Sequence, residues 1–337
     1  MTLRHKIAGT IALPLALAIA GAANAATVYD DEKQTLKIGG FVAAQAVWEM
    51  PDAGDPNYVM DLGTTRVNIA YTKKTEAGDI TVLYENDWNS AAAAAGAYRL
   101  RHAAIFYDGW VAGQTWSFFA NLNGLGETID PNGNAIKSSW ASRNAVLGKN
   151  NKLGEGMSVG IALEDRSLNS GNTVAGGTRN TSPAPDLTAN FKAKFGGVGV
   201  FAAVQGYQVN DATDADASEI KGRFTASAAV PIADVVTVKA AVTADQDNYN
   251  AVSLSGQVKL TDSVRTNLVL EQYMGDTDNT DYTTVYVNAI YRMPVGLEWG
   301  AEVQAVSADA GGAVVAPYGG ASADGDIAVR LQARYAF

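Results

Sequence analysis

The chain has 337 residues, no cysteine, two histidines and a formal net charge of -10 at pH 7. The acidic excess argues against nucleic acid as a partner, because binding to phosphates needs a basic surface. With no cysteine, and with His102 as the one histidine after residue 25, a zinc site of the usual kind is excluded, and we expect neither a metal nor a cofactor.

The first 25 residues have the three parts of a secretory signal peptide. Arg4 and Lys6 form a basic start, residues 7–20 form an apolar run, and Ala23-Asn24-Ala25 matches a cleavage site of the A-x-A kind. The apolar run has 14 residues, whereas a helix that spans a bilayer needs about 20. We therefore predict a signal peptide at residues 1–25, with a short buried core helix as the alternative.

After residue 25 the apolar residues recur with a period of two. At the end of the chain, the apolar side chains at odd positions from Ile327 to Phe337 alternate with Arg330, Gln332 and Arg334. Such alternation is typical of a β-strand with one apolar and one polar face. The pattern predicts sixteen strands, at residues 35–50, 62–73, 78–89, 97–108, 109–116, 140–149, 156–166, 186–195, 198–208, 217–230, 234–246, 249–261, 264–274, 281–293, 296–307 and 325–337.

The connections between these segments alternate between short and long. Short connections carry the Gly, Pro, Asp and Asn of hairpin turns, as at Asp108-Gly109 and Gly196-Gly197, with a somewhat longer one at residues 150–155. The long ones lie near 51–61, 90–96, 117–139, 167–185, 209–216, 275–280 and 308–324, and the connection near 247–248 is a short exception. This order predicts an up-and-down meander with its turns at one end and its loops at the other.

Sixteen strands in a closed ring leave an interior that side chains cannot fill. The polar face then lines water, the apolar face meets lipid, and closure pairs every backbone group, as lipid requires. We therefore predict an all-β fold, a 16-stranded antiparallel transmembrane β-barrel over residues 35–337, preceded by a short periplasmic segment at residues 26–34. A soluble β-sandwich or β-solenoid is the alternative, although no repeat of fixed period supports a solenoid.

Arg99 and Arg101 are assigned to the inner face, because a lipid-facing arginine at the membrane midplane costs roughly 2–4 kcal/mol. On strict alternation Ala103 and Ile105 then share the inner face, whereas Leu100, His102, Ala104 and Phe106 face outward. The same sorting predicts further pore-lining cations at Arg66, Arg143, Lys192, Lys194, Lys221, Arg223, Lys239, Lys259, Arg265, Arg292, Arg330 and Arg334.

Inward acids are fewer than inward cations on this alternation. They are Glu49, Glu85, Asp87, Glu164, Asp245, Glu271, Glu298 and Glu302, and most other acids fall in loops and turns. A net basic lumen raises the local concentration of anions. We therefore predict a preference for anions; the alternative is that the arginines only solvate the wall and pair with the inward acids.

The segment from Ser117 to Ser139 is long for a connection, and long loops are usually functional or disordered. We expect it to fold into the barrel as a constriction loop, with a surface loop as the alternative. If Glu127 or Asp130 opposes Arg99 and Arg101, a transverse field crosses the narrowest point.

The stretch from Tyr98 to Gly133 resembles the DcaP-like outer-membrane porin family. The shared features are the basic strand at Arg99 to His102, the A-G-Q-T-W-S turn at residues 112–117 and the E-T-I-D-P-x-G segment at residues 127–133. The resemblance implies a homotrimer of sixteen-stranded barrels in the Gram-negative outer membrane that passes small anionic solutes, dicarboxylates among them. It also implies that Arg99 and Arg101 lie near the constriction, and that the inserted loop begins at Trp116 and contains Glu127 and Asp130.

These observations lead us to expect a passive porin, not an enzyme. It would admit small anionic or polar solutes, contact lipid and lipopolysaccharide, and present Phe337 to the barrel-insertion machinery, because the ending Tyr335-Ala336-Phe337 resembles its signal. A general porin of weak selectivity is the alternative. A barrel hydrolase would need His102 as its base beside a serine, and an energy-coupled transporter would need about 22 strands.

Overall fold

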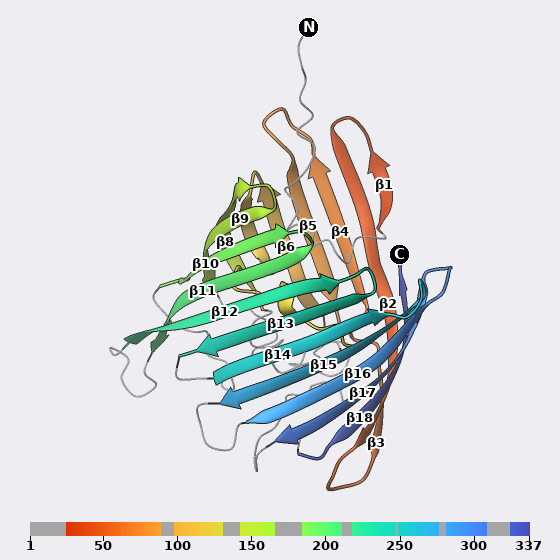
Figure 1. The fold of residues 1–337 in the computed structure, drawn as a ribbon. Helices are drawn as coiled ribbons and strands as arrows, with labels where there is room; N and C mark the ends of the chain where they lie inside the picture. The colour runs from red at the N-terminus through yellow and green to blue at the C-terminus, as the bar shows by residue number, and fades with distance from the viewer. Residues whose placement is uncertain are drawn as a thin grey trace.

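The structure is a computed structural model that describes residues 25–88, 98–130, 142–165, 184–210, 218–246, 249–275, 281–308 and 324–337. Residues 1–24 of the expected signal peptide and residues 131–139 of the expected constriction loop lie outside the described residues. Within the described ranges, no helix is long and apolar enough to cross a membrane. The strands form one antiparallel sheet that closes on itself (Figure 1).

Each predicted segment contains a strand, and two further strands, β1 and β3, lie outside those segments. The strands are β1 (Ala26–Asp30), β2 (Gln34–Met50), β3 (Asn57–Asp61), β4 (Arg66–Lys73), β5 (Ile80–Asp87), β6 (Arg99–Tyr107), β7 (Trp110–Trp116), β8 (Arg143–Gly154), β9 (Met157–Asp165), β10 (Asp186–Phe195), β11 (Val198–Asn210), β12 (Ser218–Ile232), β13 (Val236–Asp245), β14 (Tyr249–Lys259), β15 (Val264–Gly275), β16 (Tyr282–Arg292), β17 (Leu297–Ala308) and β18 (Ile327–Ala336).

The ring has sixteen strand positions, as predicted. β3 and β4 share one position, because they pair one after the other along the same edge of β2, with Met60 opposite Ala46 and Asn68 opposite Gly39. β18 pairs with the other edge of β2 and closes the ring. The predicted 16-stranded antiparallel β-barrel is therefore confirmed.

β1 continues the line of β18 along the edge of β2. Phe337 and Gly40 exchange two backbone hydrogen bonds of 3.1 Å each. The next described pair along that edge joins Ala26 of β1 to Ile38, and both β18 and β1 run antiparallel to β2. Residues 26–30, within the segment that we expected to be periplasmic, thus extend the last strand of the barrel (Figure 1).

Turns and long connections alternate between the two ends of the barrel, as predicted. The Asp108-Gly109 turn has positive φ at both residues, 44° and 81°, which suits the right-handed twist of a two-residue hairpin. The turn between β8 and β9 lies at Glu155-Gly156, because β8 continues to Gly154. The expected connection at residues 150–155 is therefore wrong: most of it extends the strand.

Apolar side chains cover the outer surface of the barrel, and polar ones face inward along most strands. On β14, for example, Leu254 is 50% exposed whereas its neighbours Ser253 and Ser255 are buried. The interior is not polar throughout, because a cluster of buried apolar side chains lies inside β4 to β9. Its members are Ala70, Leu83, Ala104, Phe106, Val111, Phe118, Val146 and Ala162.

Candidate functional site in the barrel interior

A segment that we call the inserted segment, residues 117–130, follows β7 and runs along the inner wall. Near its start, the Phe118 N–H donates to Glu164 on β9 at 2.8 Å, and the Phe118 carbonyl accepts from Asn190 on β10 at 2.8 Å. The Phe118 ring belongs to the apolar cluster inside β4 to β9. This packing explains why the inner faces of β6, β7 and β8 are apolar here. They hold the start of the inserted segment at Phe118, which we call its root.

The middle of the inserted segment is a single 3₁₀ turn, Leu122–Gly124, docked on β11 to β13. Asn121 caps the turn by accepting from the Gly124 N–H at 3.3 Å, and its Nδ2 donates to Thr225 at 2.8 Å. Lys239 then donates to the carbonyl of Leu125 at 2.8 Å. These contacts hold the backbone of the inserted segment against the wall.

Gly126 lies so close to the wall that a side chain would not fit. A Cβ atom built on it would lie 2.5 Å from a methyl carbon of Val269 on β15. Real Cβ atoms do not approach other atoms this closely, so glycine permits the contact.

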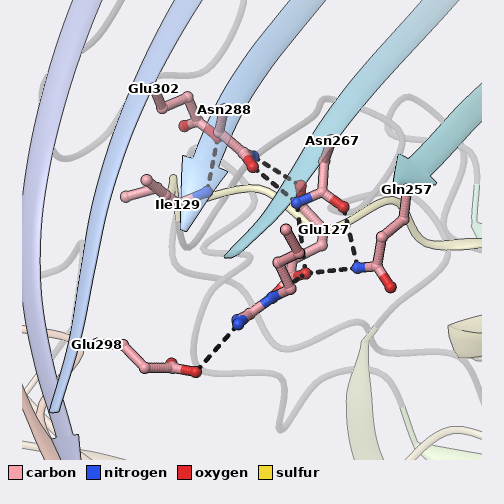
Figure 2. A network of polar contacts seen from close by, with 8 residues as sticks. Glu127, Ile129, Gln257, Asn267, Asn288, Glu298 and Glu302 are labelled. Carbon is pink, nitrogen blue, oxygen red and sulfur yellow. Dashed lines mark hydrogen bonds and ion pairs between the residues drawn. The ribbon is translucent and has the colours of Figure 1, made fainter. Parts of the chain in front are cut away.

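Beyond Gly126, the side chain of Glu127 is held by the wall (Figure 2). Its carboxylate accepts from Arg265 Nη2 at 2.8 Å and Nε at 2.9 Å, and from Gln257 Nε2 at 2.7 Å. Arg265 also donates to Glu298 on β17 at 3.2 Å. This charge-assisted, two-pronged geometry is among the strong kinds of hydrogen bonding in proteins.

The tip of the inserted segment, Ile129 and Asp130, rests on Glu302 of β17. The Glu302 carboxylate accepts the Ile129 N–H at 2.7 Å and Asn288 Nδ2 at 3.0 Å (Figure 2). It also accepts the Asp130 N–H at 2.8 Å. The Asp130 carboxylate in turn lies 3.0 Å from Arg330 Nη2 on β18. Gln45 on β2 donates to the Ile129 carbonyl at 2.9 Å, so the inserted segment reaches from β7 across to β2.

The supporting side chains form one row across five paired strands. The register places Gln257 opposite Asn267, Asn267 opposite Asn288, Asn288 opposite Glu302, and Glu302 opposite Arg330. The charged members of this row were predicted to face inward, whereas its amides were not. Their signal was present, since each of them occupies an inner position on the period-two pattern.

Arg99 and Arg101 have nearer partners than the inserted segment. Arg99 donates to Asp87 at 2.6 and 2.8 Å, and Arg101 donates to Glu85 at 2.5 Å and to Asp87 at 2.7 Å. Both acids lie on the neighbouring strand β5. The hypothesis that Glu127 or Asp130 opposes the arginine pair therefore differs from the structure, in which those carboxylates bind Arg265 and Arg330.

A β-bulge changes which side chains of β6 face inward. Glu85 pairs with His102 and Asn86 with Leu100, so Arg101 is an extra residue in β6. Arg101 and His102 are consequently both buried inside, whereas Ile105 is 49% exposed outside. The prediction that His102, Ala104 and Phe106 face outward, with Ala103 and Ile105 inward, is wrong because the bulge shifts the alternation by one residue.

His102 lies at the junction of β6, β7 and β8. Its Nδ1 atom is 3.0 Å from Thr115 Oγ1, and its ring meets the ring of Trp116 edge-on at 5.8 Å. The guanidinium of Arg143 stacks over Trp116 at 3.8 Å. The hydroxyl in hydrogen-bond distance of His102 thus belongs to a threonine and not to the serine that a hydrolase would use.

A group of arginines that we call the arginine patch consists of Arg66, Arg99, Arg101, Arg143 and Arg334. Arg66 and Arg334 both stack on Phe41, at 4.4 and 4.1 Å from its ring centre. Arg66 also lies 3.6 Å from Glu85. Among the described residues, the buried Nε atoms of Arg66, Arg143 and Arg334 have no hydrogen-bond partner.

The other predicted pore-lining cations are spread around the barrel. Lys192 lies 6.0 Å from the ring of Phe118, and Arg223 stacks over Phe119 at 4.3 Å and donates to Gln205 at 2.7 Å. Arg292 and Lys194 are exposed near the short-turn ends of β16 and β10. In the part of the chain that the structure describes, no group of three or more His, Asp or Glu side chains is placed to hold a metal ion.

Comparison with known proteins agrees with the fold. No protein-family model matches the sequence, and no curated protein matches it either. Among solved structures, the outer-membrane channel DcaP of Acinetobacter baumannii is similar with a TM-score of 0.76 and 20% identity, over 93% of this chain and 100% of that one.

Two further solved structures share the architecture. OmpT of Vibrio cholerae, described in its trimer form, has a TM-score of 0.61 and 14% identity over 91% of this chain and 100% of that one. The anion-selective porin from Comamonas acidovorans has a TM-score of 0.66 and 11% identity over 90% and 100%. The resemblance seen in the sequence is thereby confirmed for the fold: the chain has the fold of the outer-membrane porins.

Proposed function

We propose that the protein is a non-enzymatic porin of a Gram-negative outer membrane, which lets small hydrophilic solutes diffuse passively and prefers anions such as dicarboxylates. The observation that carries the anion preference is the charge balance of the arginine patch. Three of its five cations, Arg66, Arg99 and Arg101, contact two carboxylates, Glu85 and Asp87. A net positive wall next to low-dielectric protein concentrates anions in the passage.

The geometry of the patch favours carboxylates over simple spherical ions. A guanidinium presents N–H groups in a planar fork that matches a carboxylate. The side chains of Arg66, Arg143 and Arg334 are partly exposed, and their guanidinium planes are braced against Phe41 or Trp116. A solute with two carboxylates can engage two such groups at once.

The test is the reversal potential of the purified protein in a planar bilayer under a salt gradient. We expect an anion preference that Arg66→Ala and Arg143→Ala each reduce. Arg292→Ala is the matched control, because it removes the same charge from an exposed position outside the patch. A cation preference of the unaltered channel, or equal effects of all three substitutions, contradicts the proposal.

A general porin of weak selectivity is the second candidate, favoured by the close pairing of Arg99 and Arg101 with Asp87 and Glu85. Paired charges of opposite sign contribute little net field to the passage. Liposome swelling distinguishes the two candidates. Equal entry rates for neutral and dianionic solutes of the same size would favour the general porin.

The proposed assembly is a homotrimer that contacts lipid and lipopolysaccharide through its apolar outer surface and is inserted through recognition of Phe337. The trimer form of the similar OmpT supports this assembly. Light scattering of the detergent-solubilised protein, corrected for bound detergent, gives the number of chains. A monomeric mass would contradict the trimer.

A further inference from the structure

We infer that Glu302 is a positioning residue that sets the width of the passage by holding the tip of the inserted segment against the wall. The inference rests on the proposed channel function. Glu302 itself lies behind the tip and is 1% exposed, so it is not placed to touch a solute. Its role is to fix the position of Ile129 and Asp130, which lie in front of it.

The carboxylate of Glu302 contacts the backbone of the tip. It accepts two consecutive N–H groups, from Ile129 at 2.7 Å and Asp130 at 2.8 Å. Because these bonds go to the backbone, they constrain the course of the chain whatever side chains it carries. Asn288 at 3.0 Å orients the carboxylate from the neighbouring strand (Figure 2).

The contact holds the inserted segment at its far end from β7. The root is fixed by Phe118 and the middle by Asn121 and Lys239. The tip is fixed by Glu302, together with Arg265 bound to Glu127 and Arg330 beside Asp130. Since the barrel wall lies directly behind the tip, a tip that loses this anchor has room to move only toward the passage.

Replacing Glu302 by Gln keeps the size of the side chain and one acceptor oxygen but removes the charge and the second acceptor. Loss of a hydrogen bond to a charged acceptor shifts the equilibrium between the anchored and the released tip by roughly tenfold or more. We therefore expect Glu302→Gln to increase about tenfold the fraction of time that a single channel spends in a low-conductance state.

Glu85→Gln is the matched control. Glu85 is 2% exposed on β5, and its carboxylate contacts Arg101 and Arg66 rather than the inserted segment. The substitution removes the same charge from the interior and leaves the carboxylate under the tip in place. We expect both variants to shift the reversal potential in the same direction, and only Glu302→Gln to add low-conductance events.

A separate measurement distinguishes loss of position from a general loss of structure. Glu302→Gln and Glu85→Gln both remove a buried carboxylate, because Glu302 is 1% exposed and Glu85 is 2% exposed. We therefore expect urea unfolding in lipid vesicles to show similar losses of stability for the two variants, with the low-conductance events confined to Glu302→Gln.

The decisive measurement is single-channel recording of the intact protein and these variants in one lipid and one salt. Unchanged event frequency in Glu302→Gln, or low-conductance events of equal frequency in Glu85→Gln, overturns the role of Glu302. Absence of any channel from the unaltered protein instead overturns the proposed function. The two failures are therefore distinguishable in the same experiment.

Discussion

Arg330 places one guanidinium nitrogen 3.0 Å from the carboxylate of Asp130 and another 3.8 Å from that of Glu302. One buried cation thereby joins the tip of the inserted segment to the last two strands of the barrel. The Arg330 side chain is 1% exposed and also donates to Gln304 at 2.8 Å. Removal of one partner from such a group leaves buried charge uncompensated, which is far more costly than the loss of an exposed ion pair.

Arg330→Ala is therefore expected to lower the free energy of unfolding by about 3–5 kcal/mol. Asp130 and Glu302 would then face each other without the cation between them. Urea unfolding in lipid vesicles, followed by tryptophan fluorescence, measures the change. Arg292→Ala, at an exposed position, should stay within about 0.5 kcal/mol of the unaltered protein. Equal losses for the two variants would contradict this account of Arg330.

Glu85→Gln is expected to strengthen the preference for anions. The carboxylate of Glu85 accepts from Arg101 at 2.5 Å and lies 3.6 Å from Arg66, so its neutralisation leaves both cations with less compensation. The reversal potential under a salt gradient should move further toward the equilibrium potential of the anion. Glu49→Gln provides the comparison, because Glu49 bonds to Asn57 and lies outside the patch. A shift of the reversal potential toward the equilibrium potential of the cation would show that the arginine patch does not govern selectivity.

Arg143→Lys is expected to keep the charge preference but to shorten the time that a dicarboxylate blocks the channel. The guanidinium stacks on Trp116 at 3.8 Å, and lysine has neither the plane nor the fork of donors. We expect blocking events to shorten about twofold to fivefold. Dwell times from single-channel records with a dicarboxylate measure this, and Arg292→Lys serves as the control. Unchanged dwell times would exclude a direct role of the Arg143 plane.

Phe106→Ala is expected to destabilise the barrel more than the adjacent Ile105→Ala. Phe106 is 3% exposed and belongs to the inner apolar cluster, so its removal leaves a cavity that costs about 3–5 kcal/mol. Ile105 is 49% exposed on the outer face. Strict alternation counted from Arg99 places Ile105 inside and Phe106 outside, which is the reverse of the arrangement in the structure. Unfolding of both variants in the same vesicles tests the bulge, and a larger loss for Ile105→Ala would contradict it.

The strands were predictable from the sequence because a period of two is a local property of consecutive residues. Alternation in β14 and β18 needed no knowledge of the neighbouring strands. The bulge at Arg101 was not predictable, since it is defined by pairing with Glu85 and Asn86 on another strand. One extra residue then reversed the faces of His102, Ala104 and Phe106.

The inserted segment was partly predictable for a related reason. Its length and composition set it apart as a connection, and the resemblance over residues 98–133 implied that it enters the barrel. Its contacts with Arg265, Glu302 and Arg330 join residues far apart in the sequence, so no local pattern reveals them. Inward acids and inward cations do pair in the structure. The arrangement of the strands around the barrel determines which acid meets which cation.

β18 and β1 lie end to end along one edge of β2, and this arrangement affects how the barrel assembles. Gly39 leaves room where the two segments meet: a Cβ there would lie 2.6 Å from Ala25 Cβ and 3.1 Å from the Phe337 oxygen. One edge of β2 is thus shared by residues from both ends of the described chain. Until both have docked, β2 presents unpaired amides and carbonyls, which lipid does not tolerate. For the membrane location that we propose, this edge of β2 must therefore be sheltered until both segments have docked.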